Sequence, residues 1–118
     1  MWKRIRLELA RTPDAPEGRA DCGYDLLVPI DRDGHLQPEQ WRKERERAVV
    51  RRFWHNEDEQ TGNLIHSRHG WAFSYRPGED DDEPIYKLDG HRLRQGEYVT
   101  VTEHGVPMPF YVATVQAV

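Results

Sequence analysis

Residues 97–112 read Glu97-Tyr98-Val99-Thr100-Val101-Thr102-Glu103-His104-Gly105-Val106-Pro107-Met108-Pro109-Phe110-Tyr111-Val112. Apolar residues alternate with polar ones on both sides of His104-Gly105, and a period of two is typical of strands with one buried face. With His104-Gly105 as a two-residue turn, three facing pairs share one side, namely Val101 with Met108, Val99 with Phe110, and Glu97 with Val112. The sequence therefore predicts an antiparallel hairpin whose apolar side belongs to the core.

Two prolines test this register. Pro107 and Pro109 face Thr102 and Thr100, and both pairs fall at positions where hairpin strands exchange no hydrogen bonds. The missing N–H groups would then face away from the partner strand, so we expect no third strand to pair along 107–109. That stretch is predicted to be a sheet edge, which the prolines protect against aggregation.

Further strands are predicted upstream of this hairpin. Residues 4–9 alternate strictly and leave the first strand as a candidate for the opposite edge. A second hairpin with its turn at His69-Gly70 would pair Arg68 with Trp71, His66 with Phe73, and Leu64 with Tyr75 on an aromatic core face. Apolar stretches predict further strands at 22–30, 49–54 and 85–88, whereas 12–21 and 55–62 have the composition of loops.

One helix is expected in this series of strands. Pro38 suits a first helical position and good helix formers follow to Arg47, so we predict a helix over about 38–47, anchored on the sheet by Trp41. About seven strands with one helix indicate the α+β class, as an antiparallel β roll or a partly open small β-barrel.

The composition is polar for a folded protein. The 118 residues include 17 Lys and Arg against 21 Asp and Glu, a net charge of −4, and 36% hydrophobic residues. No run approaches the ~18 apolar residues of a membrane helix, which excludes a transmembrane helix. The length suits a single globular domain over 1–118. The N-terminus lacks the apolar core of a signal peptide and Cys22 is the only cysteine, so the expected location is cytoplasmic.

Potential metal ligands and nucleophiles occur without a known motif. The acidic run Glu79–Glu83 is predicted to be an exposed loop that forms no strand and buries nothing. The six histidines show no HExxH or Cys/His cluster, so no metal and no cofactor is indicated. Cys22 would be a nucleophile only beside a histidine, and a lone cysteine that opens an apolar stretch is more often a small buried hydrophobe.

Arginine and tryptophan, which are enriched at interaction hot spots, suggest the function. We expect a non-enzymatic binding or protein-interaction module for an anionic or protein partner, with oligomeric state left open. The residues expected to carry the binding surface are Arg51, Arg52, Trp54, Arg68 and Trp71.

Two alternatives come from other function classes. The basic segment 42–54 carries six Lys and Arg before Phe53-Trp54, which would suit single-stranded nucleic acid, or simply a solvated helix face. A small enzyme or metal-binding protein with a histidine-lined pocket is the other. It requires His66, His91 and either Cys22 or a carboxylate to line one concavity.

Four segments together resemble a group of short, uncharacterised bacterial proteins. They are Ala20-Asp21-Cys22-Gly23-Tyr24-Asp25-Leu26, Gly34-His35-Leu36, Arg51-Arg52-Phe53-Trp54, and Gly96-Glu97-Tyr98-Val99-Thr100-Val101. The resemblance spans most of the chain and implies a single complete domain. No activity is assigned to that group, so it implies no functional residues.

Overall fold

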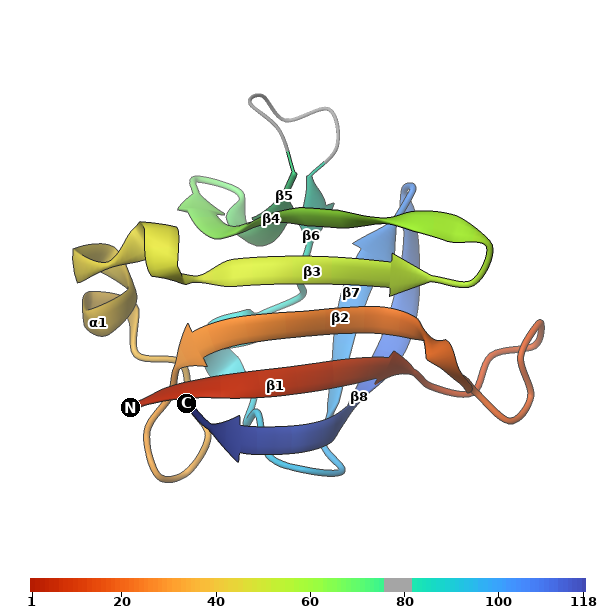
Figure 1. The fold of residues 1–118 in the computed structure, drawn as a ribbon, viewed down its shortest axis with the longest axis horizontal. Coiled ribbons are helices and arrows are strands. Elements are labelled where there is room, and N and C mark those ends of the chain that lie inside the picture. The colour runs from red at the N-terminus through yellow and green to blue at the C-terminus, as the bar shows by residue number, and fades with distance from the viewer. Residues whose placement is uncertain (76–81) are drawn as a thin grey trace.

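A computed structural model describes residues 1–75 and 82–118, in which eight antiparallel strands curl into a nearly closed barrel (Figure 1). The strands are β1 (Trp2–Leu9), β2 (Arg19–Pro29), β3 (Val49–Trp54), β4 (Glu57–Ser67), β5 (Gly70–Ser74), β6 (Glu83–Pro84), β7 (Tyr98–Glu103) and β8 (Val106–Ala117). Their order is β6-β5-β4-β3-β2-β1-β8-β7. The edge strands β6 and β7 meet through a bridge between Ile85 and Val101. The predicted partly open antiparallel barrel is confirmed at this level.

The C-terminal hairpin has the predicted register. Val101 faces Met108 and Val99 faces Phe110, while the two prolines face Thr102 and Thr100. His104 and Gly105 both have positive φ, 49° and 80°, as a type I′ turn requires. β1 pairs with β8 only from Phe110 onward, and the carbonyl of Pro109 accepts one bond from the Ala10 N–H.

The first strand is not an edge. β1 pairs with β2 on one side and with β8 on the other, so the expectation of a free edge at 4–9 is wrong. Its apolar positions face the barrel interior, where the ring of Tyr24 lies 4.7 Å from that of Phe73 and 5.2 Å from that of Phe110. These aromatic rings form the centre of the core.

The β4–β5 hairpin has the predicted buried face with a different register. His66 faces Trp71 and Leu64 faces Phe73, so the turn is Arg68-His69 instead of His69-Gly70. Each β4 residue faces a β5 residue two positions earlier than predicted. Because side chains alternate between the two faces of a strand, a shift of two residues leaves the same side chains on the same face. Leu64, Trp71 and Phe73 are accordingly buried as expected.

The predicted loop at 55–62 is wrong for most of its length. β3 turns at His55-Asn56, with Asn56 at a φ of 62°, and β4 begins at Glu57. Residues 57–61 are exposed on both faces, so no apolar alternation marks them as a strand.

The acidic run also departs from its prediction. Residues 79–81 lie outside the described part of the chain, but Glu83 belongs to β6 and is only 7% exposed. The next predicted strand, 85–88, is reduced to the bridge at Ile85, and a 3₁₀ helix, η2 (Leu88–Gly90), follows.

One short α-helix, α1 (Pro38–Lys43), and a 3₁₀ helix, η1 (Arg45–Arg47), replace the predicted continuous helix. The break is at Glu44, whose φ of −141° and ψ of 52° leave the helical region. Trp41 anchors the helix as expected, because its ring lies 4.8 Å from that of Trp71 and its Nε1–H donates to the Leu64 carbonyl at 3.1 Å. Among the described residues, no helix has the length and apolar character needed to cross a membrane.

Candidate functional site

The five residues predicted to form a binding surface do not lie on one surface. Arg51 and Arg68 are exposed, Trp54 is half-buried, and Arg52 and Trp71 are buried. Trp71 packs between Trp41 and His66, with ring centroids 4.8 and 4.5 Å away. The structure therefore brings only Arg52 and Trp54 into contact, with the guanidinium 4.5 Å from the ring centroid.

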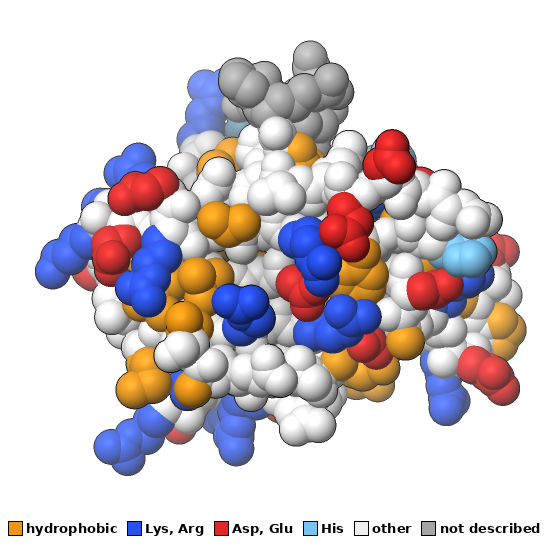
Figure 2. Space-filling model, viewed as in Figure 1, with side chains coloured by type: hydrophobic (Ala, Val, Ile, Leu, Met, Phe, Trp, Pro, Cys, Tyr) orange, Lys and Arg blue, Asp and Glu red, His pale blue; other side chains and the backbone are white. Residues whose placement is uncertain are grey.

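Arg51 is engaged on the outer face of the barrel. It forms an ion pair with Asp25 and lies 3.3 Å from a carboxylate oxygen of Glu59. On the face shown in Figure 2, basic and acidic side chains lie interspersed, with apolar side chains between them. This face offers paired charges instead of a continuous cationic patch.

Arg52 is the centre of a buried charged cluster that the sequence analysis did not anticipate. Its Nη2 lies 2.8 Å from Oε1 of Glu103 on β7, and its Nε lies 3.5 Å from Oε2 of Glu83 on β6. Its Nη1 donates to Glu57 at 2.9 Å. Arg52 and Glu103 are each 3% exposed. The arginine thus joins the two edge strands across the interior of the barrel.

The environment of Glu103 changes its acidity. Burial raises the pKa of its carboxyl group to about 7, although the guanidinium of Arg52 lies within hydrogen-bond distance. A buried carboxyl group of this kind resembles a general acid. Glu103 is nevertheless buried and lines neither the cavity beside His66 nor the cavity beside Lys3.

The basic segment 42–54 is largely neutralised by carboxylates. Arg42 pairs with Glu39, and Arg47 lies 3.6 Å from Glu44. With Arg51 and Arg52 also paired, the cations of this segment that have no carboxylate partner among the described residues are Lys43 and Arg45. Phe53 is 9% exposed, so its ring is not a platform for base stacking.

The predicted histidine pocket is only partly assembled. His66 lines a cavity of about 430 Å³ together with His69 and the carboxylate residue Asp89. His91 and Cys22 do not line this cavity, and Nδ1 of His91 lies 2.7 Å from the carbonyl of Lys87. Cys22 is buried on β2, and burial raises the pKa of its thiol, which disfavours the nucleophilic thiolate. Within 1–75 and 82–118, the one group of three potential metal ligands is the loop set Asp31, Asp33 and His35.

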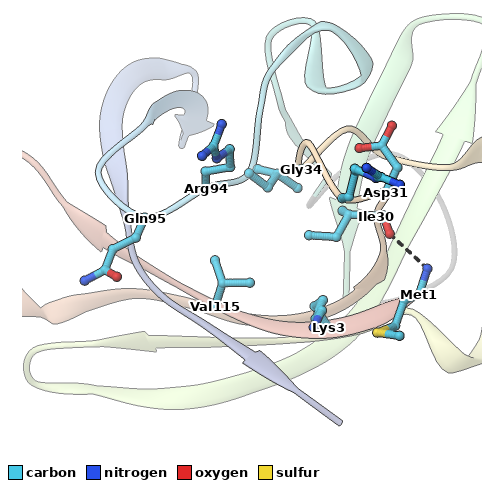
Figure 3. Close-up of a pocket in the computed structure, with 10 residues that line it drawn as sticks. Met1, Lys3, Ile30, Asp31, Gly34, Arg94, Gln95 and Val115 are labelled. Atoms are coloured by element: carbon cyan, nitrogen blue, oxygen red, sulfur yellow. Dashed lines mark hydrogen bonds between the residues drawn. The ribbon is translucent and has the colours of Figure 1, made fainter.

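A different cavity lies at one end of the barrel, between the strands β1 and β8 and the loops that follow β2 and η2 (Figure 3). Its volume is about 460 Å³, within the range of roughly 300–1,000 Å³ usual for ligand pockets. Apolar side chains of Ile30, Leu93 and Val115 line it together with the cationic side chains of Lys3, Arg32 and Arg94. The cavity therefore combines an apolar surface with positive charge.

The strand register explains how Lys3 reaches this cavity. Lys3 faces Val28 on β2 and is two residues from Ile5, and both of these residues are fully buried. Val115 faces Ile5 from β8, so Lys3 and Val115 share the inward face of the sheet. A lysine in phase with Ile5, Leu7 and Leu9 was the sequence signal for this site, and the predicted strand at 4–9 began one residue too late to include it.

The loop wall of the cavity is held in place by close backbone contacts. The Leu93 N–H donates to the Gly34 carbonyl at 2.7 Å. Gly34 has a φ of 90°, and a Cβ there would lie 2.8 Å from Cγ of Arg94. Only glycine fits both the conformation and the space, so the two loops approach closely and form a preformed wall.

Comparison with models of known protein families, with curated proteins and with solved structures gave no match. The resemblance to a group of uncharacterised bacterial proteins therefore stays a prediction.

Proposed function

We propose that this protein is a binding module for a small organic molecule, and that the ligand occupies the cavity between β1, β8 and the two loops. The observation that carries the proposal is the inward face at this end of the barrel. There Lys3 and Val115 border an open volume of about 460 Å³ instead of being covered by core side chains. The mouths of β-barrels are frequent positions for ligand sites.

Non-enzymatic binding is the class of function that the sequence suggested, but the proposed binding site is the cavity instead of the predicted Arg and Trp surface. Non-enzymatic binding remains the proposed activity, but Trp71 and Arg52 have structural contacts in the interior and are not available to a partner. The cavity is also too small for a folded partner, which favours a small molecule over the protein or nucleic-acid partners considered above.

Amide chemical-shift mapping tests the proposal. The probes are 8-anilinonaphthalene-1-sulfonate, which is anionic, and N-phenyl-1-naphthylamine, its neutral counterpart. We expect at least one of them to shift the amides of Ile30, Leu93 and Val115. Shifts confined to other parts of the barrel, or no saturable binding of either probe, would contradict the proposal.

A pair of variants separates the cavity from general apolar surface. Val115→Trp fills the cavity, whereas Val49→Trp adds the same side chain at a 40% exposed position outside it. With both variants folded by circular dichroism, only Val115→Trp should abolish probe binding. Equal losses in the two variants would show that the cavity is not the site.

A further inference from the structure

Three cationic side chains of the cavity lining have no carboxylate partner in the described part of the chain. Among the described residues, none of Lys3, Arg32 and Arg94 has a carboxylate oxygen within 4.0 Å, although all three line the same cavity. Elsewhere Arg6, Arg19 and Arg52 each lie within 3.0 Å of a carboxylate oxygen. Unpaired cations around one concavity raise the local concentration of anions.

The carboxylate that borders the cavity is already engaged. Oδ1 of Asp31 accepts the backbone N–H groups of Asp33 and His35, each at 2.9 Å. These bonds, that from His35 most of all, lower the pKa of Asp31. Its side chain therefore shapes its own loop, and its charge only partly offsets the three cations.

Apart from Gln95, the remaining side chains of the lining are apolar. Ile30 and Leu93 are buried, with exposed fractions of 4% and 1%, and half-buried Val115 lies beside them. Figure 3 shows Lys3 and Val115 on the strand wall and Arg94 on the loop wall across from them. A ligand between these walls would have Lys3 on the strand side, Arg94 on the loop side, and the apolar residues Ile30, Leu93 and Val115 in the same lining.

We infer that the ligand is an organic anion with an apolar body, such as an aliphatic or aromatic carboxylate, and that Lys3 and Arg94 bind its charged group from opposite walls. This inference rests on the proposed function. A purely inorganic anion would leave the apolar lining unused, and a neutral ligand would leave the positive charge of the lining unused. A lining that is both cationic and apolar fits a molecule with an anionic group and an apolar body.

Calorimetric titration of the two probes tests the charge preference. The anionic 8-anilinonaphthalene-1-sulfonate should bind at least tenfold more tightly than N-phenyl-1-naphthylamine, because a hydrogen bond to a charged group contributes about 1.5–3 kcal/mol. Inorganic phosphate at the same concentration should not displace the sulfonate. Displacement by phosphate, or equal affinity for the two organic probes, would overturn the inference.

Charge-removing variants identify the residues. Lys3→Met and Arg94→Met should each weaken sulfonate binding roughly tenfold and leave the neutral probe unaffected. Arg4→Met is the matched control, because Arg4 is the neighbour of Lys3, lies on the outer face and lines another hollow. An equal loss with Arg4→Met would show that net charge, not these residues, governs binding. If Lys3→Met and Arg94→Met bind both probes as tightly as the wild-type protein, the proposed function stands and the anion inference fails.

Discussion

Glu103 places a carboxyl group inside the barrel, and its ionisation should make stability depend on pH. Its pKa is about 7 in the native protein, above the ordinary value of 4.5 that applies to the unfolded chain. The native state therefore binds more protons than the unfolded state between these values, and this group makes the free energy of unfolding fall as pH rises from about 4.5 to 7. Urea unfolding at several pH values would measure the slope.

The variant Glu103→Gln isolates this contribution. The amide can still accept a hydrogen bond from Arg52 but does not titrate, so the slope across pH 4.5–7 should become smaller than in the wild-type protein. Identical slopes in the two proteins would show that Glu103 has an ordinary pKa.

Three charged residues show how much of the interior the sequence pattern predicts. Lys3, Arg52 and Glu103 each occupy a position in phase with the apolar face of their strand. The alternation alone identifies them as inward-facing, and this much was predictable. Which of them meets a counter-ion and which borders a cavity depends on strands distant in the chain, because Glu103 is 51 residues from Arg52. The sequence pattern does not contain that pairing.

At the scale of elements, glycine permits the close approach of β1 and β2. A Cβ on Gly23 would lie 1.9 Å from the carbonyl oxygen of Leu7, and the pairing changes register directly after Glu8, the residue that faces Gly23. Gly23→Ala should therefore reduce the free energy of unfolding by roughly 1–3 kcal/mol or more, as overpacking does. Gly90→Ala is the control, since nothing lies within 4 Å of its Cβ, and it should change stability by less than about 0.5 kcal/mol. Thermal unfolding that ranks the two variants equally would refute this account.

The elements also show where local patterns fail. The C-terminal hairpin was predictable because turn residues, alternation and two prolines all specify one register. The first half of β4 was not, because residues 57–61 are exposed on both faces and their strand character comes from pairing with β3. Glu83 was predicted to lie in solvent because four acidic residues precede it, and its burial depends on tertiary contacts with Arg52 and with the Tyr75 hydroxyl, which donates to it at 2.6 Å.

At the scale of the whole molecule, the sheet is closed by few interactions. β1 and β2 are paired on both sides, whereas β6 and β7 are joined by the Ile85–Val101 bridge and by the Tyr86 N–H, which donates to the Thr100 carbonyl at 2.9 Å. Arg52 reinforces this seam from within, since it contacts carboxylates of both edge strands. The barrel should therefore open first between β6 and β7.

Hydrogen exchange would measure this opening. The amide of Tyr86 should exchange faster than those of β1, because local opening of the seam costs less than global unfolding. Arg52→Met removes the cation that contacts Glu83 and Glu103, and leaves the carboxyl groups of both edge strands in the interior without that partner. Exchange at Tyr86 should then rise roughly tenfold more than exchange in β1, whereas Arg4→Met should alter neither. If Tyr86 and β1 accelerate by the same factor, Arg52 stabilises the fold as a whole and the seam is not a separate point of opening.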